Sequence, residues 1–241
     1  GKWKNILGEQ KYPIQYVSVA GGKLFINYLE DASCMVYQYS MNGTLEHNIP
    51  LPGLGDVSGF FGGPDDTVIF YRFSSFVMPP AIYKYNIVTG VSTLWFQSAS
   101  ALNTSAYETK RVFYKSKDST SIPMFITAKK GLVLDGNQAV LLYAYGGFNI
   151  KASLGFTAMR LPWLENGGIY VTACIRGGGD YGNQWHQAGS GMKKQTGFDD
   201  FYAAADYLFK NNYTNPAKLA IQGGSNGGLL MAVAITQHPE M

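Results

Sequence analysis

The chain has 241 residues, a formal net charge of +3 and a charged share of 15%, against about 25% in typical globular proteins. Its lysines and arginines form no basic block and no apolar run is long enough to span a bilayer, so we expect neither a nucleic-acid nor a membrane partner. Its two cysteines, Cys34 and Cys174, supply neither a disulfide framework nor the spacing of a metal site, and we expect no cofactor.

Residues 1–104 alternate apolar and polar residues in short runs separated by Gly, Asp and Pro, which predicts strands and no helix. A weak repeat aligns Tyr37 with Tyr83 and Tyr39 with Tyr85, an offset of 46 residues in both cases. That period is typical of four-stranded propeller blades, so the pattern fits either two blades or a general all-β meander. Because a closed propeller needs about four to eight blades, two blades would leave sheet faces uncovered.

From Arg111 onward the pattern changes to strands alternating with helices. The runs 139–145 and 168–175 are continuously apolar, which is typical of strands that are covered on both faces. Segment 198–210 places its apolar residues on one helical face. With a short strand at 218–222, these elements predict the first half of an α/β-hydrolase-like sheet.

Ser225 lies in the pattern Gly223-x-Ser225-x-Gly227, between that short strand and an apolar helix. This is the nucleophile-elbow pattern, in which a tight strand-to-helix turn exposes a serine hydroxyl. The glycines are needed because side chains would obstruct the turn and the packing of helix on strand. The N–H of Asn226, at the positive end of the helix dipole, can stabilise a developing oxyanion. The plainer interpretation is a Ser/Gly loop without a catalytic role.

Four motifs in a fixed order carry a resemblance to a known family. They are Tyr143-Ala-Tyr-Gly-Gly-Phe-Asn149, Ile175-Arg-Gly-Gly-Gly-Asp-Tyr-Gly182, Phe198-Asp-Asp-Phe201 and Gly223-Gly-Ser-Asn-Gly-Gly228. Together they resemble the prolyl oligopeptidase family, and further matches at 70–76 and 121–125 extend the resemblance over nearly the whole chain. The resemblance implies a mixed fold: the last blades of a seven-bladed β-propeller in residues 1–104, and the N-terminal half of an α/β-hydrolase domain, with a partial doubly wound sheet, in residues 105–241.

The same resemblance assigns roles to four residues. Ser225 would be the nucleophile, the N–H of Asn226 and the hydroxyl of Tyr145 would form the oxyanion hole, and Phe148 would lie near the pocket where a proline ring stacks. The implied activity is that of a serine endopeptidase. It would cleave short proline-containing peptides on the C-terminal side of proline, through an acyl-enzyme on Ser225.

A serine becomes a good nucleophile only beside an oriented base, and in α/β-hydrolases the Asp and His of the triad follow the serine along the chain. Met241 is only 16 residues beyond Ser225. Of the three histidines, His47 falls in a predicted turn, His186 follows the glycine-rich loop in a packing role, and His238 ends the helix that begins at the serine. We therefore expect an internal segment of a larger peptidase, inactive alone, that needs the remainder of its polypeptide for a complete site.

Other functions fit parts of the pattern. Gly177-x-Gly179-x-x-Gly182 matches the dinucleotide fingerprint, with Asp199 about twenty residues further on, but that fingerprint should open a helix and 183–192 is broken by glycines. An α/β-hydrolase esterase would use the same elbow, although the attached β half argues against a lipid surface. A non-catalytic propeller/hydrolase binding module would keep the fold alone. The sparse cysteines favour a cytoplasmic location, with the periplasm or secretion as alternatives.

Overall fold

The computed structural model describes residues 3–98 and 103–241, and the chain divides into two compact units. The first unit contains the described residues through 98 and a short later segment, Ser153–Phe156. The second contains 103–152 and the residues from Thr157 onward. The domain boundary predicted after residue 104 stays a prediction.

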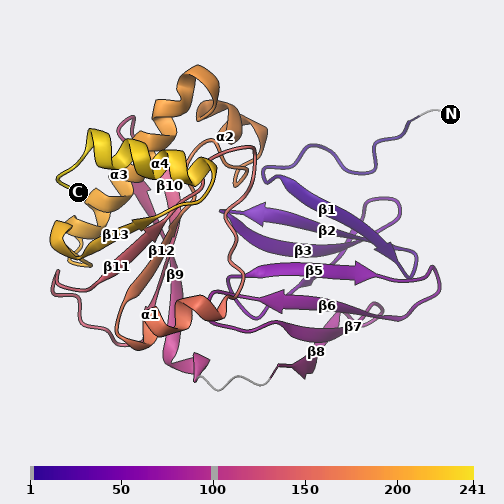
Figure 1. Cartoon of the computed structure of the whole chain (residues 1–241). Coiled ribbons are helices and arrows are strands. Elements are labelled where there is room, and N and C mark those ends of the chain that lie inside the picture. The colour runs from indigo at the N-terminus through magenta and orange to yellow at the C-terminus, as the bar shows by residue number, and fades with distance from the viewer. Residues whose placement is uncertain (1–2, 99–102) are drawn as a thin grey trace. The chain divides into compact units, whose positions relative to one another are not determined.

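The first unit consists of two four-stranded antiparallel sheets, each a meander of consecutive strands (Figure 1). The strands are β1 (Ile14–Ala20), β2 (Lys23–Glu30), β3 (Ser33–Ser40), β4 (Leu45–Ile49), β5 (Asp56–Phe61), β6 (Val68–Ser74), β7 (Ala81–Asn86) and β8 (Val91–Gln97). No helix occurs among residues 3–98, as predicted. The repeat is confirmed as well, because Tyr37 and Tyr39 lie in β3, Tyr83 and Tyr85 lie in β7, and each of these is the third strand of its sheet.

Aromatic side chains fill the core of the first unit. At a bulge in β5, Phe60 adopts a left-handed backbone with φ of 65° and buries its ring completely. Its ring stacks on Tyr71 at 4.6 Å, and Tyr71 stacks on Tyr83 at 5.2 Å. Tyr85 joins the two sheets, since its hydroxyl donates to Gln38 Oε1 at 2.7 Å. A bulge that re-aims one side chain therefore completes this core.

The segment Ser153–Phe156 belongs with the first unit because of one carboxylate. Asp56, at the start of β5, accepts a hydrogen bond from the Ser153 hydroxyl at 2.9 Å and another from the Leu154 N–H at 3.0 Å. Leu154 itself is fully buried. Nothing in the residue pattern of this segment predicts that grouping, because its partner lies almost one hundred residues earlier in the chain.

The second unit is built on a five-stranded sheet of order β13-β11-β12-β10-β9. Its strands are β9 (Tyr107–Lys115), β10 (Ser121–Lys129), β11 (Val140–Tyr143), β12 (Ile169–Ala173) and β13 (Leu219–Gln222). Strands β13, β11 and β12 are parallel, and β10 pairs antiparallel with both β12 and β9. All five residues of β12 are buried, as expected of a parallel strand covered on both faces.

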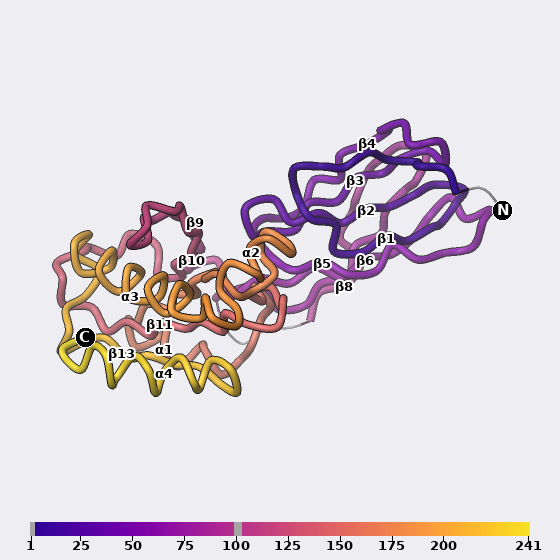
Figure 2. Tube along the Cα trace, turned by 90° about the horizontal axis from the view of Figure 1, so that it is seen from above, coloured from indigo at the N-terminus to yellow at the C-terminus, as the bar shows by residue number. Residues whose placement is uncertain are grey.

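The helices of the second unit lie between the parallel strands and, in one case, after the last of them. They are α1 (Leu161–Glu165), α2 (Asn183–Ala188), α3 (Lys194–Lys210) and α4 (Asn226–Gln237), with short 3₁₀ turns at Thr104–Ala106, Ala158–Arg160, Gly191–Lys193 and Pro216–Lys218. Helices α3 and α4 lie side by side in Figure 1 and Figure 2. Both pack on the sheet through one apolar cluster that includes Phe201, Leu208 and Leu230. Leu161 and Leu164 of α1 are buried outside that cluster. The connection from β11 to β12 and the connection from β12 to β13 run in opposite directions across the sheet, so right-handed crossovers place α1 and α3 on opposite faces.

Candidate active site

Ser225 lies between β13 and α4, and its backbone has φ of 53° and ψ of −116°. A non-glycine residue in this region is strained and persists only where the surrounding packing imposes it. Here the surroundings leave no room for side chains on two neighbours. A Cβ on Gly223 would lie 2.4 Å from the carbonyl oxygen of Gly227, and a Cβ on Gly227 would lie 2.7 Å from that of Ala144. The serine side chain is exposed at the top of this turn, as the elbow pattern predicts.

The loop that follows β11 lies directly beside the elbow. Tyr143 pairs with Gln222 at the ends of the parallel strands β11 and β13, so both chains leave the sheet at the same edge. The Asn226 side chain then crosses between them, because its Nδ2 donates to the Tyr145 carbonyl oxygen at 2.6 Å. The structure thus brings together three residues to which the resemblance gives roles: Ser225, Asn226 and Tyr145. Asn226 is the first residue of α4, so no carbonyl within the helix accepts a hydrogen bond from its backbone N–H.

Phe148 lies three residues beyond Tyr145 in the same loop. It is 72% exposed and has φ of 54°, and Asn149 follows with φ of 55°. A hydrogen bond from the Ile150 N–H to the Gly147 carbonyl, at 3.0 Å, closes this turn. The turn displays the Phe148 ring on the surface rather than burying it in the core.

The three histidines have other partners. His186, on α2, places Nδ1 2.7 Å from the Gly177 carbonyl oxygen, which confirms its packing role. His238 follows the end of α4 and contacts Glu240 at 2.9 Å. His47 lies in β4 and not in the predicted turn, because the hairpin that leads to it turns earlier, at residues 41–43. Over residues 3–98 and 103–241, no histidine hydrogen-bonds to Ser225.

The acidic residues ahead of the serine are also engaged elsewhere. Asp200 of α3 is fully buried and binds Arg176 through two side-chain nitrogens, with the shortest contact at 2.6 Å, and it accepts the Arg176 N–H at 2.9 Å. Arg176 also reaches Asp118, and this guanidinium holds the pKa of the Asp118 carboxyl well below its usual range. Ser116 donates to Asp200 at 2.5 Å. The network fastens the start of the glycine-rich loop to α3.

The glycines that match the dinucleotide fingerprint are required for packing within the protein, so they no longer support a dinucleotide site. A helix, α2, does follow Gly182, which corrects the expectation that 183–192 is non-helical; six residues fit before Gly189 ends it. However, a Cβ on Gly177 would meet the Gly146 carbonyl oxygen at 2.5 Å, and one on Gly179 would meet that of Asn149 at 2.3 Å. The space that the fingerprint reserves for a pyrophosphate is occupied by the protein's own backbone.

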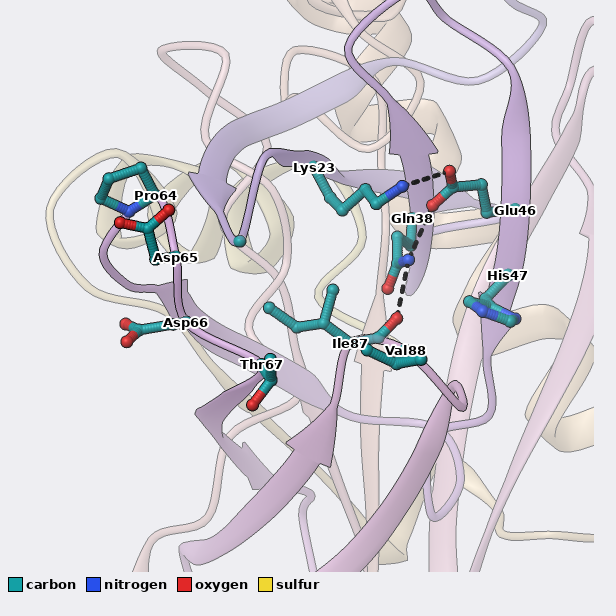
Figure 3. A pocket seen from close by; sticks show the side chains of 11 residues that line it. Lys23, Gln38, Glu46, His47, Pro64, Asp65, Asp66, Thr67, Ile87 and Val88 are labelled. Carbon is teal, nitrogen blue, oxygen red and sulfur yellow. Dashed lines mark hydrogen bonds and ion pairs between the residues drawn. The ribbon is translucent and has the colours of Figure 1, made fainter.

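A cavity of about 540 Å³ lies within the first unit, lined from β2, β3, β4 and the turns at 64–67 and 87–88 (Figure 3). Lys23 Nζ contacts Glu46 Oε1 at 2.5 Å, and Gln38 Nε2 donates to Glu46 Oε2 at 2.8 Å and to the Ile87 carbonyl at 3.0 Å. These charged and amide groups satisfy one another, and Gln38 also accepts the Tyr85 hydroxyl. The arrangement indicates a structural junction between the sheets.

Family models match both parts of the chain. The model for the prolyl oligopeptidase N-terminal beta-propeller domain matches residues 1–98, and the model for the prolyl oligopeptidase family matches residues 154–241. The chain belongs to the prolyl oligopeptidase family. Among the residues described, the structure contains neither a helix long and apolar enough to cross a membrane nor a cluster of potential metal ligands.

Curated relatives within the prolyl oligopeptidase family include prolyl endopeptidases from Elizabethkingia meningoseptica, 44% identical over 99% of this chain, and from Dictyostelium discoideum, 41% identical over 100%. A solved structure from a study of two prolyl endopeptidases is 46% identical, with a TM-score of 0.93 over 99% of this chain and 35% of its own. Prolyl oligopeptidase B from Galerina marginata, solved with a 35mer hydrolysis and macrocyclization substrate, is 33% identical, with a TM-score of 0.91 over 97% of this chain and 34% of its own. The chain spans about a third of the length of the curated relatives it matches, 34% and 32% of these two prolyl endopeptidases.

Proposed function

We propose that the protein carrying this chain is a serine endopeptidase that cleaves short peptides on the C-terminal side of proline, with Ser225 as its nucleophile. The observation that carries this proposal is the Ser225 elbow, joined by Asn226 to the Tyr145 loop, in a chain of the prolyl oligopeptidase family. A strained, exposed serine at a helix N-terminus is the arrangement that serine hydrolases use for acyl transfer.

In the proposed reaction, Ser225 Oγ attacks the carbonyl carbon of the proline residue while a general base takes the hydroxyl proton. The carbonyl oxygen gains negative charge, and the Asn226 N–H and the Tyr145 hydroxyl donate to it. A fixed phenol is as suitable a donor as a backbone amide when it is aimed at the developing charge. The C–N bond then breaks, the amine leaves with a proton from the base, and water hydrolyses the acyl-enzyme.

We assign Phe148 to substrate binding, because an exposed aromatic ring on the same loop as Tyr145 offers a flat apolar surface to a proline ring. We further assign the two sheets of the first unit to two blades of a seven-bladed propeller, and the second unit to the N-terminal half of an α/β-hydrolase domain. The four-stranded meanders and the β11-β12-β13 connections support these assignments. A cytoplasmic location stays a prediction.

The base and the acid that orients it would come from polypeptide outside these 241 residues. No histidine in the described ranges is placed beside Ser225, and the relatives are about three times as long. On this proposal the 241-residue chain alone acylates at a negligible rate. In subtilisin, loss of the catalytic histidine costs about 10⁶ in turnover.

The test uses the protein expressed from its complete reading frame and a blocked Gly-Pro chromogenic peptide, with the matching Gly-Ala peptide as the specificity control. We expect cleavage of the Gly-Pro peptide and a loss of at least about 10⁴-fold in Ser225→Ala. Ser190→Ala is the matched control, since Ser190 lies outside the elbow pattern, before the 3₁₀ turn Gly191–Lys193. Equal cleavage of both peptides would contradict the preference for proline, and no cleavage by the folded protein would favour an esterase or a binding module.

A further inference from the structure

We propose that Lys194 is a positioning residue for the oxyanion site, holding the Tyr145 loop in register with the Ser225 elbow. This inference rests on the proposed function. Lys194 is the first residue of α3 and belongs to none of the motifs that identify the family. It is half-buried, whereas its neighbour Lys193 is exposed.

The Lys194 ammonium bridges the two chain segments that would carry the oxyanion donors. Its Nζ donates to the Gly146 carbonyl oxygen at 2.8 Å and to Asn226 Oδ1 at 3.0 Å. Asn226 in turn donates from Nδ2 to the Tyr145 carbonyl oxygen at 2.6 Å. The consecutive carbonyls of residues 145 and 146, just past the end of β11, are therefore both held by side chains, one from α3 and one from α4.

The ammonium also decides the orientation of the Asn226 side chain. An ammonium carries only donors, so the carboxamide atom that faces it must be the oxygen, and the NH₂ group is left to face Tyr145. A neutral side chain at position 194 would allow the Asn226 carboxamide to adopt either orientation. In the rotated orientation its oxygen would face the Tyr145 carbonyl oxygen, and no hydrogen bond could form between them. Lys194 thus fixes which way the Asn226 side chain donates, and through it the peptide plane that precedes Gly146.

The Tyr145 loop depends on these hydrogen bonds because its backbone contains left-handed residues. Gly146 has φ of 57° and Phe148 has φ of 54°, and a Cβ on Gly147 would lie 2.4 Å from Asn226 Nδ2. Among the residues described, Lys194 pairs with no carboxylate, and burial lowers the pKa of its ammonium. Its hydrogen-bonding capacity is therefore directed at the loop and at the elbow rather than at a salt bridge.

The test compares Lys194→Met with Lys193→Met in the protein from the complete reading frame, using the blocked Gly-Pro peptide. Both variants remove one charge and keep a similar length, but only one removes the bridge. We expect Lys194→Met to lower kcat by about 10- to 100-fold, the cost of misplacing a reacting group by about 1 Å. KM should change by less than about threefold, since the donors act mainly in the transition state. Lys193→Met should match the parent, and Lys194→Arg should recover part of kcat.

A double-mutant cycle with Tyr145→Phe separates positioning from general destabilisation. If Lys194 acts through the Tyr145 loop, Lys194→Met costs much less kcat in the Tyr145→Phe background than in the parent. A variant that merely folds poorly would lose the same factor in both backgrounds, and that result would overturn the inference. An unchanged kcat in Lys194→Met would overturn it as well. If instead the parent protein shows no turnover that depends on Ser225, the proposed function itself fails, which the Ser225→Ala comparison reveals separately.

Discussion

At the residue scale, the contact between Gly227 and the carbonyl oxygen of Ala144 determines how closely α4 approaches the end of β11. The carbonyl of Ala144 occupies the position of a Gly227 side chain, and Gly227 is itself buried. The next residue, Gly228, faces far more open space, with the Gly223 carbonyl 3.9 Å from where its Cβ would lie. Two adjacent glycines in the same helix turn therefore differ in what a methyl group would do to the elbow.

We predict that Gly227→Ala destabilises the second unit by about 1–3 kcal/mol, because the added methyl must displace backbone atoms rather than a flexible side chain. It should also lower kcat on the Gly-Pro peptide, since the helix carries the Asn226 N–H. Urea denaturation followed by tryptophan fluorescence, with steady-state kinetics, measures both effects.

Gly228→Ala is the matched control for this prediction. In a helix without a clash, alanine is favoured over glycine by up to about 1 kcal/mol, so this variant should be neutral or stabilised. Equal destabilisation by the two substitutions would contradict the account of the elbow.

At the scale of elements, α3 is the common support of the site. Its first residue, Lys194, reaches the Tyr145 loop and the elbow, and its buried Asp200 holds Arg176 at the start of the glycine-rich loop. The apolar face between them packs on the sheet beside α4. One helix therefore fixes two loops that leave the same edge of the sheet.

We predict that Asp200→Asn destabilises the second unit by about 3–5 kcal/mol, because it leaves the buried Arg176 guanidinium without its main partner. The neighbouring Asp199→Asn should cost at most about 1 kcal/mol, since Asp199 is not fully buried, accepts one exposed hydrogen bond from Gln195 at 2.9 Å and approaches the exposed Lys117 at 4.0 Å. Thermal melting of the two variants beside the parent measures the difference. Similar melting temperatures for both variants would contradict a structural role for the Arg176–Asp200 pair.

At the scale of the whole molecule, local patterns in the sequence were enough to predict the strands, the elbow and the family. The repeat of Tyr37 with Tyr83 is recognisable because the third strand of each sheet carries its tyrosines at the same spacing, and the Ser225 elbow is recognisable because its glycines lie close together in sequence. The bridge from Lys194 to Gly146 spans 48 residues, and the bond from Leu154 to Asp56 spans 98. No local pattern encodes such contacts, so only the fold reveals them. Helix α2 is not predicted by the sequence pattern, because glycines lie on either side of a helix of only six residues.

The measurement that tests the central claim most directly is covalent labelling by a serine-directed fluorophosphonate, with the modified residue located by peptide mass spectrometry. The protein from the complete reading frame is compared with its Ser225→Ala variant. We predict a single adduct on Ser225, formed in step with loss of Gly-Pro cleavage and absent from the variant. An adduct on another residue, or full cleavage activity with Ser225 unmodified, would contradict the assignment of Ser225 as the nucleophile.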